Sequence, residues 1–233
     1  HVRPGYVTTA VGAGHDYGQS MAVQADGKIL VAGYRSNGSD NDFALVRYHS
    51  DGTLDTSFGS GGQVITAIGA GDDMATSLVV QADGKIVLAG SSDNKFALVR
   101  YNADGSLDDS FGTGGTLTTA IGPGGDSANS VTLQSDGKIV VAGYSYNGSN
   151  HDFALVRYNA DGSLDSSFGG GGMLTTAIGP SNDLVYSVTL QPDGKIVAAG
   201  YSWNGFRLDF AMARYDADGS LDTYRKALRV SKH

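Results

Sequence analysis

The sequence predicts an all-β protein, a four-bladed β-propeller with four antiparallel strands in each blade. One unit of roughly 55 residues occurs four times, which is typical of a repeat architecture. Its tetrapeptide Asp-Gly-Lys-Ile begins at Asp26, Asp83, Asp136 and Asp193. A second turn, Asp-Gly followed by Ser or Thr, begins at Asp51, Asp104, Asp161 and Asp218. No part of the unit has the 3.6-residue apolar spacing that indicates a helix.

The third unit shows the four strands most clearly. Ser130–Gln134 is a short β-prone run, and a Ser-Asp-Gly turn separates it from Lys138–Tyr144. Lys138–Tyr144 and Asp152–Tyr158 are almost continuously apolar, which is typical of strands covered on both faces. Met173–Ile178 supplies a fourth strand. Four strands with buried middle strands describe one propeller blade.

The first residues of the chain match the fourth strand of the unit. Gly5–Gly12 has the pattern of Met173–Gly179, whereas the last unit stops after Asp222 without such a strand. We therefore expect one propeller domain over residues 1–222, whose last blade is completed and closed by the N-terminal strand. This pairing would remove an open sheet edge. An open half-ring, two copies of which pair into a ring of about eight blades, is the alternative.

Residues 223–233 leave the repeat and form a basic C-terminal tail on an acidic protein. The tail carries Arg225, Lys226, Arg229 and Lys232. Two interpretations stay open: a solvated or artificially appended tail, and a segment that docks on a partner. The second would make a homo-oligomer through the tail.

Composition excludes several classes of function. The net charge of −8 and the pI near 4.8 argue against nucleic acid as a partner, because its phosphates require a basic surface. The chain has no Cys, so it forms neither disulfides nor thiolate metal sites. No apolar run approaches the ~18 residues of a membrane span. Abundant Gly, Ser, Thr and Asn favour a secreted or cell-surface protein, although no signal peptide is present in this sequence.

The repeat motifs resemble a known family. The chain combines Asp-Gly-Lys-Ile-Val and Phe-Ala-Leu-Val-Arg-Tyr with Ser-Leu-Asp-x-Ser-Phe-Gly at Ser106–Gly112 and Ser163–Gly169. As a set they resemble the bacterial delta-60 repeat, a β-propeller repeat, and the layout is similar to NHL-type propellers. The resemblance extends from Gly5 to Asp222 and implies a secreted or surface-associated bacterial protein, but no particular activity. The C-terminal tail does not match.

The variable loops of the unit are the candidate ligand-binding face. If the first strand of each unit is innermost, the loops entering it share one face with the loops joining the second and third strands. The short Asp-Gly turns occupy the other face. Aromatic and amide side chains on variable loops can stack on a sugar ring or anchor a protein partner. The candidate ligand-binding residues are Tyr17, Tyr34, Tyr144, Tyr146, Tyr201, Trp203, Phe206, Asn147 and Asn204.

A structural interpretation of some of these tyrosines is equally open. Tyr34, Tyr144 and Tyr201 recur at one position of the repeat and could instead wedge between blades. A second recurring set is acidic and precedes each inner strand: Asp16, Asp73, Asp126 and Asp183. Four carboxylates around one axis would attract a hard cation, with Ca²⁺ as the possible cofactor. The alternative is a local turn in which each carboxylate accepts backbone N–H groups.

Catalytic patterns are poor. The five His residues show no metal-ligand spacing, all 24 acidic residues are Asp, and neither a Gly-x-Ser-x-Gly elbow nor a phosphate loop occurs. We therefore expect no catalytic residues. The leading hypothesis is a non-catalytic binding module, secreted or on the cell surface, that recognises a glycan or a surface protein. A structural subunit of a self-assembling structure is the second hypothesis, and an Asp-based hydrolase or lyase is the third.

Overall fold

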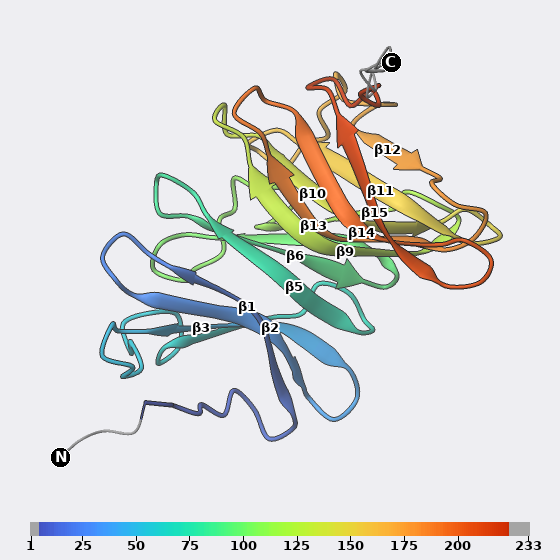
Figure 1. Ribbon diagram of the computed structural model, residues 1–233. Helices are drawn as coiled ribbons and strands as arrows, with labels where there is room; N and C mark the ends of the chain where they lie inside the picture. Colours follow the sequence, from blue (N-terminus) through green and yellow to red (C-terminus); the bar gives the residue numbers. More distant parts are fainter. Residues whose placement is uncertain (1–4, 224–233) are drawn as a thin grey trace, which may run out of the picture.

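The computed structural model describes residues 5–223 as a series of four antiparallel β-sheets and no helix. Successive sheets are the blades of a curved arc (Figure 1). The all-β class and the division into four blades are thereby confirmed. The basic tail beyond Thr223 lies outside the described residues. Over the described part of the chain, no helix is long and apolar enough to cross a membrane.

The strands of each blade pair in chain order. Blade 1 contains β1 (Asp16–Val23), β2 (Ile29–Ser36), β3 (Asn41–Tyr48) and β4 (Gln63–Thr66). Blade 2 contains β5 (Asp73–Val80), β6 (Ile86–Ser92), β7 (Lys95–Tyr101) and β8 (Thr116–Thr119). Blade 3 contains β9 (Gly124–Leu133), β10 (Ile139–Tyr146), β11 (His151–Tyr158) and β12 (Met173–Thr176). Blade 4 contains β13 (Asp183–Leu190), β14 (Ile196–Trp203) and β15 (Leu208–Tyr215).

The Asp-Gly turns fix the register of the first two strands. In blade 3, Gln134 donates its N–H to the carbonyl of Lys138 at 2.8 Å, and Asp136 Oδ1 accepts the N–H of Lys138 at 3.2 Å. Gly137 adopts φ +84°, a conformation that favours glycine. Leu133 therefore pairs with Ile139, and the apolar run of β10 enters the sheet directly after the turn.

The hydrophobic core lies between the blades, in three clusters that each join two consecutive blades. In the third cluster, Phe153 and Leu155 from β11 pack against Val185 and Val188 from β13, and the first three of these are fully buried. Because the middle strands contact a neighbouring blade on each side, they are apolar on both faces. This explains the near-continuous apolar runs of the sequence.

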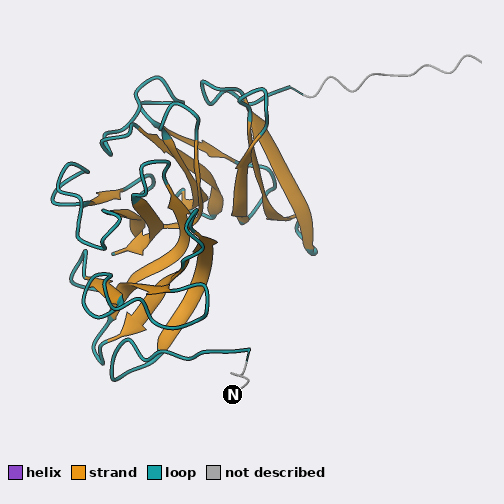
Figure 2. Cartoon of the chain, turned by 90° about the vertical axis from the view of Figure 1, so that its left-hand side faces the viewer, coloured by secondary structure: helices purple, strands orange, loops and turns teal. Residues whose placement is uncertain are grey.

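Closure of the last blade by the N-terminal strand is not confirmed. In the described residues, blade 4 has three strands, and its edge strand β15 pairs only with β14. The segment 5–11 lies instead beside blade 1, where Thr9 Oγ1 accepts the hydroxyl of Tyr48 at 2.8 Å and Asp16 Oδ2 accepts the N–H of Val11 at 2.9 Å. A wide opening consequently separates this segment from blade 4 (Figure 2).

Candidate functional site

The loops are sorted onto two faces, as expected from the sequence. The loop joining β2 to β3 reaches the loop that enters β5, because Asn41 donates from its backbone N and its Nδ2 to Asp72 Oδ1 at 3.0 and 2.8 Å. His151 makes the same backbone contact to Asn182 Oδ1 at 2.9 Å. At the opposite ends of the strands, Gly169 donates its N–H to the carbonyl of Asp218 at 2.8 Å. The variable loops therefore form one continuous rim.

Asn147 and Asn204, two of the candidate ligand-binding residues, organise tight turns on this rim. Asn204 Oδ1 accepts the N–H groups of Phe206 and Arg207 at 2.9 and 3.1 Å. Its Nδ2 donates to Asp209 Oδ2 at 2.6 Å. Asn147 does the same for its own turn and donates to Asp152 at 2.8 Å. These side-chain amides therefore hold the loops in shape.

The blade 4 turn presents unusual side chains on this shared geometry. Phe206 is 91% exposed, Arg207 is also exposed, and Trp203 at the end of β14 is half-buried. The equivalent turn of blade 3 carries Ser149 and Asn150 at the positions of Phe206 and Arg207. A rigid turn that is polar in one blade is therefore aromatic and cationic in another.

The remaining aromatic candidates lie in strands and form separate groups. Tyr17 of β1 stacks on Tyr34 of β2, with their ring centroids 4.8 Å apart. In blade 3, Tyr144 and Tyr146 contact the ring of His151 at 5.0 and 5.4 Å. The nine candidates therefore do not converge on one pocket, and their groups lie on blades 1, 3 and 4.

Two further aromatic partners complete these groups, and sequence reasoning missed one of them, Tyr186. His151 begins β11, and Tyr186 of β13 lies 5.7 Å from Tyr201. Burial, with Tyr186 nearby, raises the pKa of Tyr201. Tyr186 lies at the β-bulge between Val185 and Ser187. The repeat pattern alone does not show this bulge, because it becomes visible only in the pairing register of β13 and β14.

The tyrosines that are fully buried between blades are different ones. Tyr34, Tyr144 and Tyr201 are half-buried, whereas Tyr101 and Tyr158 at the ends of the third strands are fully buried. Their hydroxyls contact threonines of the preceding blade: Tyr101 with Thr66 and Tyr158 with Thr119, both at 2.7 Å. Tyr34, Tyr144 and Tyr201 thus remain partly accessible.

The recurring Asp residues ahead of the inner strands bind backbone amides. Asp73, Asp126 and Asp183 are buried, and each accepts the N–H of the isoleucine five residues earlier, at 2.6 to 2.7 Å. Asp16 accepts from Val11 in the same way, although Asp16 is exposed. Within residues 5–223, no three His or Asp side chains are grouped as a metal site requires.

On the opposite face, each blade carries an Arg–Asp ion pair. Arg157 Nε donates to Asp165 Oδ2 at 2.7 Å, Lys138 Nζ lies 2.9 Å from the same oxygen, and the guanidinium covers the ring of Phe168 at 4.6 Å. Burial opposes ionisation of Asp165, but hydrogen bonds from Ser167, Lys138 and Arg157 hold its pKa well below the ordinary value. The same Arg–Asp pairing occurs in all four blades, which indicates a structural role.

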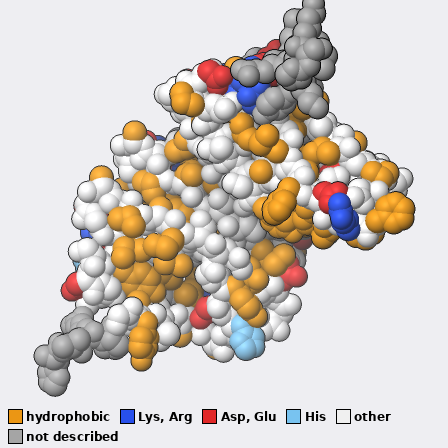
Figure 3. Space-filling view, in the orientation of Figure 1, with side chains coloured by type: hydrophobic (Ala, Val, Ile, Leu, Met, Phe, Trp, Pro, Cys, Tyr) orange, Lys and Arg blue, Asp and Glu red, His pale blue; other side chains and the backbone are white. Residues whose placement is uncertain are grey.

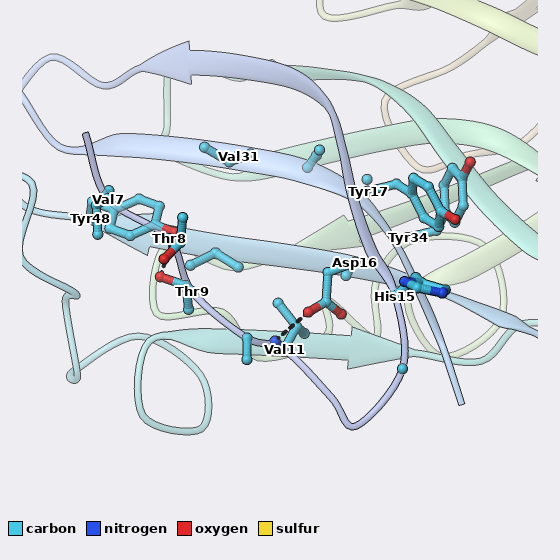
Figure 4. A pocket seen from close by; sticks show the side chains of 17 residues that line it. Val7, Thr8, Thr9, Val11, His15, Asp16, Tyr17, Val31, Tyr34 and Tyr48 are labelled. Carbon is cyan, nitrogen blue, oxygen red and sulfur yellow. Dashed lines mark hydrogen bonds between the residues drawn. The ribbon is translucent and has the colours of Figure 1, made fainter. Parts of the chain in front are cut away.

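Each end of the arc carries a hollow, and the one on blade 4 is almost wholly apolar. A hollow of about 630 Å³ lies between the N-terminal segment and blade 1. Figure 4 shows Thr9 beside Tyr48 at one part of this hollow and the stacked Tyr17 and Tyr34 at another. A second hollow of about 480 Å³ lies on blade 4 and is lined by Tyr186, Tyr201, Phe210 and Met212, among others. Figure 3 shows exposed hydrophobic side chains gathered over both regions of the surface.

Comparison with solved structures supports the fold. A protein of unknown function from Bacteroides caccae is 12% identical with a TM-score of 0.50, and the match covers 88% of this chain and 65% of that one. A gluconolactonase from Xanthomonas campestris is 14% identical with a TM-score of 0.46, covering 86% of this chain and 59% of that one. The chain thus spans less than two thirds of each of these proteins. At such identities the likeness concerns the fold alone. A comparison with curated protein sequences finds no match.

Family models match the repeats directly. A WD-domain, G-beta repeat model matches residues 171–206. A second model, for a β-propeller domain of unknown function (DUF5122), matches residues 24–58, 81–111, 134–168 and 191–223, one segment in each blade. Together these four segments make up more than half of the sequence. The chain belongs to the DUF5122 β-propeller family.

Proposed function

We propose that the protein is a non-catalytic binding module that recognises a glycan or a surface protein through its variable-loop face. The observation that carries this proposal is Phe206, which is 91% exposed at the tip of the blade 4 turn. An exposed ring on a rigid turn offers apolar area that a partner can cover. Trp203 and Arg207 flank it, and aromatic residues and arginine are enriched at binding interfaces.

The turn presents these side chains in a fixed geometry. Two backbone amides are tied to Asn204, and Arg207 Nε pairs with Asp209 at 3.0 Å. Little conformational freedom would therefore be lost when a ligand binds. The ring of Phe206 could stack on a sugar face or enter a pocket of a protein, while the Arg207 guanidinium could donate hydrogen bonds to hydroxyl or carboxylate oxygens.

A glycan array followed by titration of each hit tests the proposal. The double variant Phe206→Ser/Arg207→Asp gives the blade 4 turn the residues Ser39 and Asp40 of the blade 1 turn, which has the same hydrogen bonds. We expect at least tenfold weaker binding and an unchanged circular dichroism spectrum. Trp203→Ala should also weaken binding, whereas Ser149→Ala on the blade 3 turn should not. Equal affinity of the double variant and the parent would remove this face from the proposal.

Two further parts of the proposal concern setting and assembly. The motif resemblance to delta-60 repeats supports a secreted or cell-surface location. A role as a structural subunit is the second candidate function, because apolar surface is exposed at both ends of the arc: Met21 is 62% exposed on blade 1 and Phe210 is 104% exposed on blade 4.

A further inference from the structure

We propose that two copies of this chain close one ring head to tail, with blade 4 of each copy seated on blade 1 and segment 5–11 of the other. The inference deepens the second candidate function and is independent of the loop-face proposal. It rests on one feature: the two ends of the arc are the two halves of an interface that the chain already forms three times internally.

The inner strands define the first part of this repeated interface. A serine of each blade accepts a backbone N–H from the inner strand of the next blade. Leu78 donates to Ser20 at 3.2 Å, Val131 to Ser77 at 3.2 Å, and Val188 to Ser130 at 3.1 Å. The next pair in this series is Ser187 of blade 4 with the N–H of Met21 in blade 1 of another copy, and both residues are exposed.

The outer strands define the second part. The hydroxyl of Tyr101 contacts Thr66, that of Tyr158 contacts Thr119, and that of Tyr215 contacts Thr176, each threonine lying in the outer strand of the preceding blade. Tyr48 of blade 1 makes the same contact with Thr9 at 2.8 Å. Segment 5–11 therefore lies beside blade 1 as the outer strand of a preceding blade lies beside each later blade, and within residues 5–223 no inner strands accompany it.

Blade 4 has the complementary gap. Phe210 and Met212 lie in its edge strand β15, at repeat positions whose residues are buried in the other blades. Phe210 is 104% exposed and Met212 is 56% exposed. The corresponding side chains are all 0% exposed: Phe43, Phe96, Phe153, Leu45, Leu98 and Leu155. In those blades the partner of the phenylalanine is the outer-strand threonine, as in Phe153↔Thr176. The same register pairs Phe210 with Thr9 and Met212 with Val7.

Both surfaces that would meet carry apolar side chains. Tyr186, Phe210 and Met212 line the almost wholly apolar hollow on blade 4. On the other side, Val7, Val31 and Tyr48 line part of the hollow of about 630 Å³ on blade 1. Phe210 and Met212 project from the exposed edge of β15. The register of the repeat places them opposite Thr9 and Val7 of the other copy. Docking would bury both side chains and give β15 its missing neighbour.

The geometry of the internal interfaces identifies a second copy as the occupant. The same bonds join blades 1 to 2, 2 to 3 and 3 to 4, and after these three steps the arc is still open (Figure 2). A fourth step of the same kind therefore cannot reach blade 1 of its own chain. Two arcs related by a twofold axis give about eight blades, within the usual range for propellers, and such a head-to-tail contact closes on itself.

Sedimentation velocity over a hundredfold range of concentration provides the first test. We expect a species with twice the chain mass, and a monomer for Phe210→Asp, because the carboxylate would be buried in the apolar interface. The control Phe206→Ser changes an equally exposed phenylalanine outside the interface and should remain a dimer. A monomer at every concentration, or a dimer that tolerates Phe210→Asp, overturns the proposal. Loss of ligand binding by Phe206→Ser with the dimer intact separates this test from that of the loop face.

Cross-linking provides the second test. The chain has no Cys, so Val7→Cys and Met212→Cys introduce the only thiols. Cross-strand neighbours lie about 4.5–5.5 Å apart between Cα atoms, which suits a disulfide. Oxidation of the double variant should give a covalent dimer of twice the chain mass, and a mixture of the two single variants should give one cross-link. An oxidised product of single mass would show closure within one chain, and a ladder of polymers would show an open filament. Either result overturns the proposal.

Discussion

Phe153→Ala should strongly destabilise the interface between blades 3 and 4. The ring of Phe153 is 0% exposed and belongs to the cluster that contains Phe168, Val185 and Val188. Removing a buried phenylalanine costs the lost transfer free energy and leaves a cavity, together about 3–5 kcal/mol in the free energy of unfolding. At a denaturant slope of roughly 2 kcal/mol per molar urea, the urea midpoint should fall by about 2 M.

The chain provides a matched control for this prediction. Phe210→Ala makes the same chemical change at the same repeat position, but the side chain is 104% exposed. Exposed substitutions usually change stability by less than about 0.5 kcal/mol, so its midpoint should stay close to that of the parent. The measurement is urea unfolding followed by tryptophan fluorescence, at protein concentrations low enough to keep the arc monomeric. Equal losses for the two variants under these conditions would refute the assignment of the core to the spaces between blades.

Two other predictions concern pH and close packing. The pKa values of Asp55 and Asp165 both lie well below the ordinary value. The hydrogen bond from the Ser57 hydroxyl is the largest cause for Asp55, and hydrogen bonds outweigh the effect of burial for Asp165. Their contribution to stability should be complete above about pH 4, where an unfolded Asp is ionised, and should be lost as the pH falls further; a urea midpoint that is flat from pH 6 to pH 2 would contradict this. Gly143→Ala should destabilise blade 3, because the added Cβ would lie 2.0 Å from the carbonyl oxygen of Ser127. In Gly170→Ala the nearest atom to the added Cβ lies 3.8 Å away, so this variant should be tolerated. Thermal unfolding of the two variants compares them.

The repeat made most of the blade architecture predictable. The Asp-Gly turn at Asp136 and the apolar run of β10 gave the inner hairpin, and the alternation of turns and runs gave the rest of the blade. The sorting of loops onto two faces followed from chain direction alone, and the Asn41–Asp72 contact agrees with it. Local signals of this kind depend on a few neighbouring residues, and a sequence displays those directly.

The candidate site was less predictable, because its residues act through neighbours that only the register brings together. Asn147 and Asn204 were selected for their amide groups, yet these groups hold turns. The contact between the rings of His151 and Tyr144 depends on β10 and β11 pairing with a particular offset. Phe206 could be selected without the register, because the other two Asn-Gly turns have a serine at its position in the sequence.

Ring closure could not be read from the repeat because the period determines the strands in a blade and not the angle between blades. That angle is set by the side chains that separate the sheets, such as Phe153 and Leu155 against Val185, and by bonds such as the one between Ser130 and Val188. Because the three interfaces are nearly identical, each blade is rotated relative to the previous one in nearly the same way. The N-terminal segment contacts Tyr48 as an outer strand contacts the corresponding tyrosine of the next blade, but its predicted pairing with the last blade of the same chain is not confirmed. In the two-copy ring that we propose, segment 5–11 keeps its contact with Tyr48, and the open edge of β15 from the other copy docks on it.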